Sequence, residues 1–130
     1  MDRNEISGAI VDAAMKVHSA LGPGLLESAY AACLRHELIK RGLRVASEVP
    51  VPVVYDGIKL EAGYKLDLLV EDTVIVELKA VQTLAKAHEV QLVNYLVATG
   101  FDEGLLLNFG AERLEFKKKF RLPESEPVSF

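Results

Sequence analysis

Three charged residues, Asp67, Glu77 and Lys79, lie within two short apolar segments, residues 64–70 and 73–79, whose composition is typical of β-strands. Ionised carboxylate and ammonium groups are costly to bury unless they are paired or bind a metal. Carboxylate oxygens are the ligands that a hard cation such as Mg²⁺ prefers, and a lysine beside the cation can offset charge on a phosphate. These residue types therefore indicate metal-dependent cleavage of a phosphodiester.

The alternative interpretation is a buried ion pair that joins Lys79 to Glu77 or to Asp67. Such a pair stabilises a fold only weakly, because the cost of desolvating both charges offsets most of their attraction. Stability alone is thus a poor reason to place three charges in apolar strands. The pattern favours a functional site.

The spacing of the three residues sets a geometric condition for that site. Glu77 and Lys79 are two residues apart and therefore project to the same face of a strand. A tight turn at residues 71–72 would place Asp67 opposite Val76, on the other face from Glu77. We therefore predict either a connecting loop with an odd number of residues or a β-bulge near Asp67.

The rest of the chain predicts alternating helices and strands. Apolar residues at helical spacing predict three helices, at residues 2–21, 25–41 and 86–99. The predicted strands lie at residues 43–60 with a turn at Asp56-Gly57, and at 64–70, 73–79, 104–109 and 114–120. Pro50 and Pro52 lack N–H donors, which places the first strand segment at a sheet edge or at a kink. The helix before residues 104–109 indicates a crossover, so this strand should lie parallel to an earlier one.

Two details concern the helices. Asp2 or Asn4 is suited to cap the first helix. On the second helix, intervals of about 100° place Glu27 between Leu34 and Leu38 on the apolar stripe. Its carboxylate then points towards the interior or a neighbouring cleft; the alternative is a position at the edge of the stripe, in solvent.

The composition fits one globular domain, with 50% hydrophobic and 26% charged residues among 130. A formal net charge of −4 argues against a protein that coats nucleic acid through a globally basic surface, whereas an enzyme needs only a local positive track. Cys33 is the single cysteine, and the sequence has no apolar run of about 18 residues. We expect a cytoplasmic protein without membrane contact, with a domain at residues 1–122 and a flexible tail at residues 123–130.

Two motifs resemble those of a known nuclease superfamily. Asp67 followed by Glu77-x-Lys79 is similar to the Asp…Glu-x-Lys signature of the PD-(D/E)XK nuclease superfamily. Residues 24–30, Gly-Leu-Leu-Glu-Ser-Ala-Tyr, resemble the motif after which one of its families, GxxExxY, is named. The resemblance covers residues 6–121 and implies a restriction-endonuclease-like α/β fold. Its α-β-β-β-α-β core has a mixed central sheet flanked by helices, here with an extra N-terminal helix.

The resemblance also implies roles for individual residues. Lys79 would be the catalytic lysine, with Glu77, Asp67, Glu27 and Gln91 completing the catalytic set. The implied ligands of a Mg²⁺ or Mn²⁺ cofactor are Asp67, Glu77, the backbone carbonyl of Leu78 and, directly or through water, Glu27. Gln91 and Tyr95 resemble the Gln-x-x-x-Tyr motif of RecB-like and phage-exonuclease-like members, which packs by the lysine and the scissile phosphate.

Two further residues are candidates for substrate binding. His88 lies one turn before Gln91, within reach of a phosphate; the alternative is a structural helix histidine. Tyr30 either hydrogen-bonds to the site through its hydroxyl or fills the core.

Three functions follow from these observations. The first is a Mg²⁺- or Mn²⁺-dependent nuclease that hydrolyses nucleic acid, DNA rather than RNA. The second is a non-catalytic module on the same fold that binds nucleic acid or protein. The third is an accessory subunit that forms a homodimer or works with a partner subunit. The intact Asp67, Glu77 and Lys79 favour the nuclease.

Overall fold

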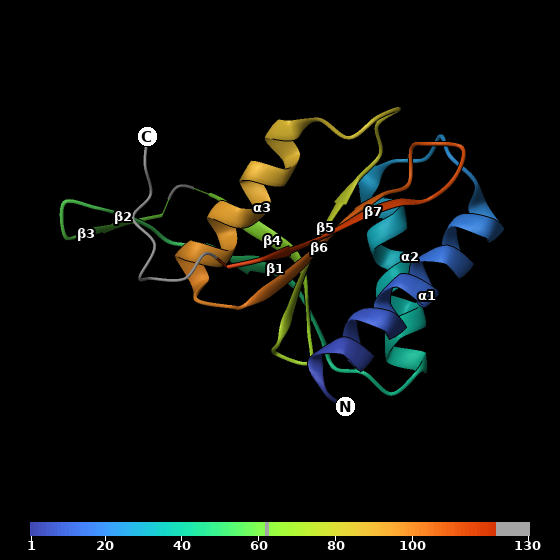
Figure 1. The fold of residues 1–130 in the computed structure, drawn as a ribbon, viewed down its shortest axis with the longest axis horizontal. Helices are drawn as coiled ribbons and strands as arrows, with labels where there is room; N and C mark the ends of the chain where they lie inside the picture. The colour runs from blue at the N-terminus through green and yellow to red at the C-terminus, as the bar shows by residue number, and fades with distance from the viewer. Residues whose placement is uncertain (62, 122–130) are drawn as a thin grey trace.

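A five-stranded mixed sheet lies between α1 and α2 on one face and α3 on the other (Figure 1). The structure is a computed structural model that describes residues 1–61 and 63–121. The helices are α1 (Arg3–Leu21), α2 (Glu27–Lys40) and α3 (Lys86–Thr99). The strands are β1 (Val45–Pro50), β2 (Val53–Tyr55), β3 (Ile58–Leu60), β4 (Lys65–Val70), β5 (Val74–Lys79), β6 (Glu103–Asn108) and β7 (Glu115–Phe120). The predicted tail at residues 123–130 lies outside the described residues.

The order of strands in the main sheet is β1-β4-β5-β6-β7. Only β5 and β6 pair in parallel, and α3 connects them across one face of the sheet, as a parallel pair requires. All six residues of β6 are buried, in agreement with the continuous apolar pattern of this segment. The architecture confirms the predicted α/β fold, with a mixed central sheet flanked by helices and an extra N-terminal helix.

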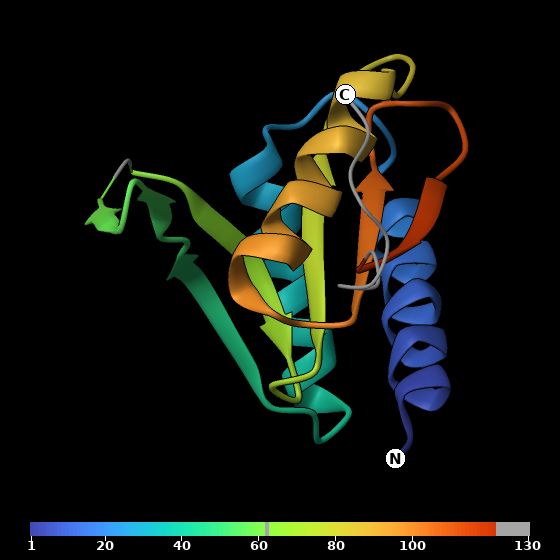
Figure 2. The same cartoon turned by 60° about the vertical axis from the view of Figure 1, so that its left-hand side comes forward.

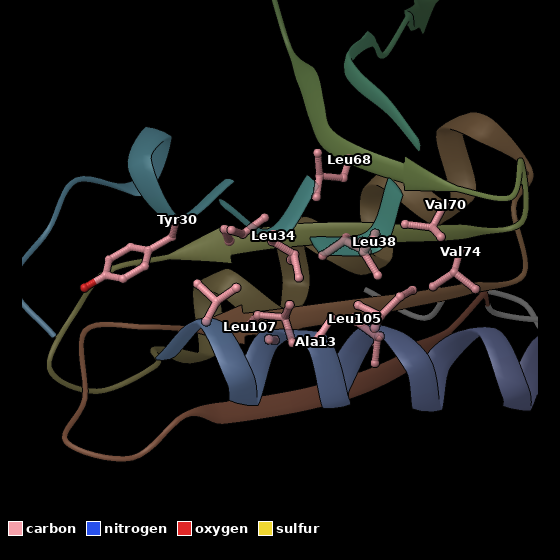
Figure 3. Close-up of a cluster of buried hydrophobic side chains, with 14 of the residues drawn as sticks. Ala13, Tyr30, Leu34, Leu38, Leu68, Val70, Val74, Leu105 and Leu107 are labelled. Carbon is pink, nitrogen blue, oxygen red and sulfur yellow. The ribbon is translucent and has the colours of Figure 1, made fainter. Parts of the chain in front are cut away.

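The larger hydrophobic core lies between the sheet and the helices α1 and α2. Figure 3 shows how Leu34 and Leu38 of α2 meet Leu68 of β4 and Leu105 of β6 in this core. Helix α1 begins at a capping box, in which the Asp2 side chain accepts a hydrogen bond from the Glu5 N–H at 2.8 Å. Asp2 is therefore the cap, one of the two predicted candidates.

A smaller core lies on the opposite face, beneath α3. Leu92 and Leu96 of the helix pack there against Leu66, Ile75 and Leu106 of the sheet. Both faces of the sheet are thus covered, although the core beneath α3 has fewer members. Within residues 1–61 and 63–121, none of the helices combines the length and apolar character that a membrane span needs.

A separate hairpin, β2–β3, stands away from the main sheet (Figure 2). Strand β1 ends at Pro50, and Pro52 precedes β2, so the prolines mark the kink between two strands as predicted. The predicted turn at Asp56-Gly57 joins β2 to β3, where both turn residues have positive φ angles of 53° and 72°. The 43–60 segment therefore contributes to two sheets.

Candidate active site

The loop between β4 and β5 brings Asp67 and Glu77 opposite each other. The two strands pair Leu68 with Val76, and the connecting loop consists of three residues, 71–73. Continuing the same register makes Asp67 the neighbour of Glu77 across the strands. The odd loop length is one of the two predicted alternatives and is confirmed.

Along strand β4, the regular alternation of side chains between the two faces of the sheet is broken at Asp67. Leu68 packs in the core beneath α1 and α2, whereas Leu66 packs in the core beneath α3. Residues two apart in a regular strand share a face, so the backbone turns over between them. The pairing of β4 with β1 is interrupted at the same point, opposite Glu48, whose φ is 51°. The register does not shift across the interruption, so no β-bulge is involved.

Both carboxylates hydrogen-bond to the backbone of the opposite strand. The N–H of Asp67 donates to Glu77 Oε1 at 3.0 Å, and the N–H of Leu78 donates to Asp67 Oδ2 at 2.8 Å. Side chains thus continue the connection between β4 and β5 beyond the last backbone pair. This arrangement holds two acidic groups side by side between the strands.

The environment of Glu77 disfavours its negative charge. Glu77 is 5% exposed. This burial is the larger cause, and the nearby negative charge of Asp67 the second cause, of the rise in the pKa of Glu77 to about 8. A divalent cation would relieve both effects by supplying positive charge and oxygen coordination. Mg²⁺ typically takes one or two carboxylates with water and substrate oxygens, so Asp67 and Glu77 fit such an ion.

Lys79 does not form the buried ion pair considered above. Its charge acts to lower the pKa of Glu77, but this effect is smaller than those of burial and Asp67. In the part of the chain that the structure describes, no contact within 4.0 Å joins the Lys79 ammonium to Glu77 or Asp67. Lys79 is half-buried at the end of β5, beside the carboxylate pair.

Glu27 lines the same hollow as Asp67. This hollow of about 750 Å³ lies between the start of α2 and strands β1 and β4, with Glu48 and Arg35 also on its walls. Glu27 is the first residue of α2 and is exposed, so its carboxylate faces a cleft rather than the core. Among residues 1–61 and 63–121, no three His, Cys, Asp or Glu side chains form a metal-binding group. Glu27 is therefore not close enough to form such a group with Asp67 and Glu77.

Gln91 and Tyr95 approach the site from the opposite face of the sheet. They line a groove between α3 and the β2–β3 hairpin. Burial raises the pKa of the Tyr95 hydroxyl, and the charges of Glu77 and Asp67 raise it further. The two carboxylates are therefore close enough to act on Tyr95. Glu27 and Asp67 line the hollow beside α2, whereas Tyr95 lines the groove on the α3 side of the sheet.

A comparison with protein families supports this geometry. The model of the PD-(D/E)XK nuclease superfamily matches residues 4–120. The chain belongs to this superfamily.

The comparison with solved structures agrees on the fold. The crystal structure of SSO0001 superimposes with a TM-score of 0.56 at 17% sequence identity, over 75% of this chain. The present chain spans about half the length of SSO0001, 52%. A comparison with curated protein sequences finds no match. Membership of the narrower GxxExxY family remains a prediction.

The structure gives the two remaining candidates local roles within this PD-(D/E)XK domain. The Tyr30 hydroxyl donates to the Gly22 carbonyl at 2.5 Å and accepts from the Leu25 N–H at 3.1 Å. Its fully buried ring stacks on Phe109, at one end of the core in Figure 3. His88 Nδ1 accepts from the Ala85 N–H at 3.0 Å and so caps the start of α3. Both groups serve the fold in these positions.

Asn108 and Gly110 were missed by the sequence analysis. Asn108 pairs with Lys79 in the parallel strands β5 and β6, and its fully buried amide bonds both the N–H and the carbonyl of Val81. A Cβ on Gly110 would lie 2.4 Å from the Val81 nitrogen, so only glycine permits this approach. These two residues hold the chain immediately after Lys79. The polar Asn at the end of an apolar run was the available signal.

Proposed function

We propose that the chain is a Mg²⁺- or Mn²⁺-dependent nuclease that hydrolyses phosphodiester bonds in DNA. The observation that carries the proposal is the Asp67–Glu77 pair, two adjacent carboxylates that are hydrogen-bonded in place. Among residues 1–61 and 63–121, no Lys, Arg or His nitrogen lies within 4.0 Å of either carboxylate. Membership of the PD-(D/E)XK superfamily makes nuclease chemistry the natural use of such a pair.

Asp67 and Glu77 would hold the cation, with the Leu78 carbonyl as a further ligand. Glu27, on the wall of the same hollow as Asp67, would act through water. The cation would supply Lewis acidity at the phosphate and lower the pKa of water. The backbone N–H groups bonded to both carboxylates fix their positions before any ligand binds.

Lys79 would provide positive charge to the phosphate in the transition state. The Lys79 carbonyl accepts a hydrogen bond from the Phe109 N–H at 2.8 Å, which anchors the backbone from which the ammonium extends. Gln91 and Tyr95 would orient the same phosphate from α3.

The test is cleavage of labelled single- and double-stranded DNA, with RNA substrates in parallel, in the presence of Mg²⁺ or Mn²⁺. We expect Asp67→Asn and Lys79→Ala each to lower the cleavage rate at least ~100-fold, as the loss of a transition-state contact does. The matched controls are Asp72→Asn, at an exposed loop position with φ 51° that Asn tolerates, and Lys117→Ala on β7. Both controls should cleave like the wild type.

The opposite results are equally clear. Absence of metal-dependent cleavage, together with absence of Mn²⁺ binding by calorimetry, would overturn the proposal. Nucleic-acid binding that survives Asp67→Asn and Lys79→Ala without any cleavage would identify the non-catalytic binding module instead.

A further inference from the structure

The groove between α3 and the β2–β3 hairpin has about 1000 Å³ of space and opens beside Tyr95 and Gln91. Most of its lining is apolar, with Val53 and Val54 on one wall and Val90 on the other. Val54 and Val90 are 67% and 49% exposed. The groove is therefore an open, largely apolar surface on the α3 side of the sheet.

The charge of this groove differs from that of the rest of the chain. Among residues 1–61 and 63–121, no Asp or Glu residue lines the groove, and Lys86 is the one charged residue that does. A polyanion can therefore enter without repulsion from the walls. A duplex, however, binds mainly through several phosphate–cation contacts, and one lysine supplies little of that attraction. Apolar walls instead suit the faces of bases that are not paired.

Tyr64 occupies the position where such a base would stack. It is 49% exposed and lies three residues before Asp67, with its ring centroid 6.2 Å from that of Tyr95. Its carbonyl accepts a hydrogen bond from the Val51 N–H at 2.8 Å, which fixes the backbone at the base of the hairpin. The ring is thus held from one side by Tyr95 and open to a ligand over about half of its surface.

Cations flank the tyrosine. Tyr64 also lines a neighbouring hollow of about 330 Å³, together with Lys59, Lys65 and one acidic residue, Glu61. With Lys86 in the groove itself, three lysines line the two hollows that Tyr64 borders. Proteins that bind single strands combine aromatic stacking platforms with such local positive charge along the backbone path.

We propose that this groove binds the unpaired bases of a single-stranded DNA, with Tyr64 as the stacking residue. The inference rests on the proposed nuclease function and names its substrate class. Tyr64 directly precedes β4, the strand that carries Asp67, so a nucleic-acid strand whose bases stack on Tyr64 lies close to the carboxylate pair. The nuclease therefore acts on single strands or unpaired ends in preference to intact duplex.

The experiment measures binding by fluorescence anisotropy, in EDTA so that no metal-dependent cleavage occurs. The probes are a labelled 12-nucleotide single-stranded DNA of mixed sequence and the blunt duplex of the same sequence. We expect the single strand to bind more tightly. Tyr64→Ala should weaken its binding about tenfold, in the range of one lost stacking contact, whereas Tyr64→Phe should bind like the wild type. Tyr55→Ala is the matched control, because Tyr55 is 73% exposed on the same hairpin but does not line the groove.

Three results would overturn the inference. The first is equal binding by Tyr64→Ala and the wild type, and the second is a duplex that binds as tightly as the single strand. The third is a homodimer, seen by sedimentation, that Tyr64→Ala dissociates, since a second copy would then fill the groove. Cleavage assays distinguish this failure from failure of the nuclease proposal. Metal-dependent cleavage of duplex that is insensitive to Tyr64→Ala leaves the nuclease intact, whereas single-strand binding without cleavage refutes the nuclease alone.

Discussion

Two buried glutamates at opposite ends of the central strands, Glu77 and Glu103, differ in what surrounds them. Glu103 is fully buried at the start of β6, hydrogen-bonded by the Ser7 hydroxyl. Arg3 Nε lies 3.3 Å from its Oε1, an ion pair without the alignment of a hydrogen bond, and Lys118 lies at 3.9 Å. Glu77 has Asp67, a like charge, as its neighbour instead.

The comparison shows that burial alone does not mark a functional carboxylate. The fold itself supplies positive charge to Glu103, which links α1, β6 and β7 and has no need of a ligand. At Glu77 the fold supplies a second negative charge, and the raised pKa is the consequence. The missing counter-charge is what points to a cation at this end of the sheet.

The first prediction is that substitutions of the two glutamates by glutamine change the free energy of unfolding in opposite directions. Glu103→Gln should lower the free energy of unfolding by about 1 to 2 kcal/mol, because it removes the charge that pairs with Arg3 and Lys118, whose own side chains are 42% and 36% exposed. Glu77→Gln should raise the stability of the metal-free protein at pH 8, because it removes a disfavoured charge. Urea unfolding at pH 8 in EDTA measures both. Changes of the same sign in the two variants would contradict the comparison.

The second prediction concerns pH. The pKa of Glu77 is raised to about 8 from an ordinary 4.5, so the folded state holds the proton more tightly than the unfolded state. The stability due to this group is complete below the ordinary pKa and is lost as the pH rises to about 8. The advantage of Glu77→Gln over the metal-free wild type should therefore grow from pH 5 to pH 8 and then level off. Paired unfolding curves across this range provide the measurement.

Two other carboxylates, Glu37 and Glu71, give stability the opposite dependence on pH. Bonding to Lys16 lowers the pKa of Glu37, and bonding to Arg44 lowers that of Glu71, so their stabilisation is lost in acid. Both groups are unchanged in the variant, so their effects cancel in the difference. A difference that is flat from pH 5 to pH 8 would refute the raised pKa of Glu77.

The third prediction concerns the effect of added Mn²⁺ on stability. Mn²⁺ at 100 times its dissociation constant should stabilise the wild type by about 2.7 kcal/mol. At a fixed Mn²⁺ concentration, the stabilisation should be larger at pH 8 than at pH 6, because Glu77 must lose its proton to bind the ion. Thermal unfolding with and without Mn²⁺ measures it. Glu103→Gln should retain the response and Glu77→Gln should lose it; retention in both variants would place the ion elsewhere.

The smallest predicted effect concerns Asn108, which anchors the chain after Lys79. Asn108→Ala should lower kcat about tenfold with little change in KM, because misplacement of the lysine affects the transition state more than binding. Asn4→Ala, at an exposed position on α1, is the control. Steady-state cleavage kinetics provide the measurement. A loss of stability at unchanged kcat would show that Asn108 serves the fold only.

Much of the fold was predictable from local pattern. Helical and strand periodicity located every helix, and the Asp56-Gly57 pair located the hairpin turn. The requirement that Asp67 and Glu77 converge predicted either an odd loop length or a β-bulge, because side chains alternate along strands, and the structure has the odd loop. Among the helices, the predicted bounds were least accurate for α2, which begins at Glu27 rather than at residue 25.

The roles of polar side chains were less predictable. Tyr30 belongs to the motif that suggested the GxxExxY family, yet its hydroxyl bonds to the turn before α2. His88 bonds to the backbone at the start of its own helix. Such partners depend on where loops pass in three dimensions, which apolar periodicity does not encode.

The sequence by itself determined the order of elements, the superfamily signature and the chemistry that Asp67, Glu77 and Lys79 can perform, because these depend on residue type and local spacing. Only the tertiary structure decided which buried glutamate has cations beside it. Arg3 reaches Glu103 from α1, far away in the chain, and Lys118 reaches it from the neighbouring strand β7. The neighbour of Glu77 across the strands is instead the like charge of Asp67. Electrostatic environment is set by such long-range neighbours, and it is this environment that distinguishes the candidate metal site from a structural ion pair.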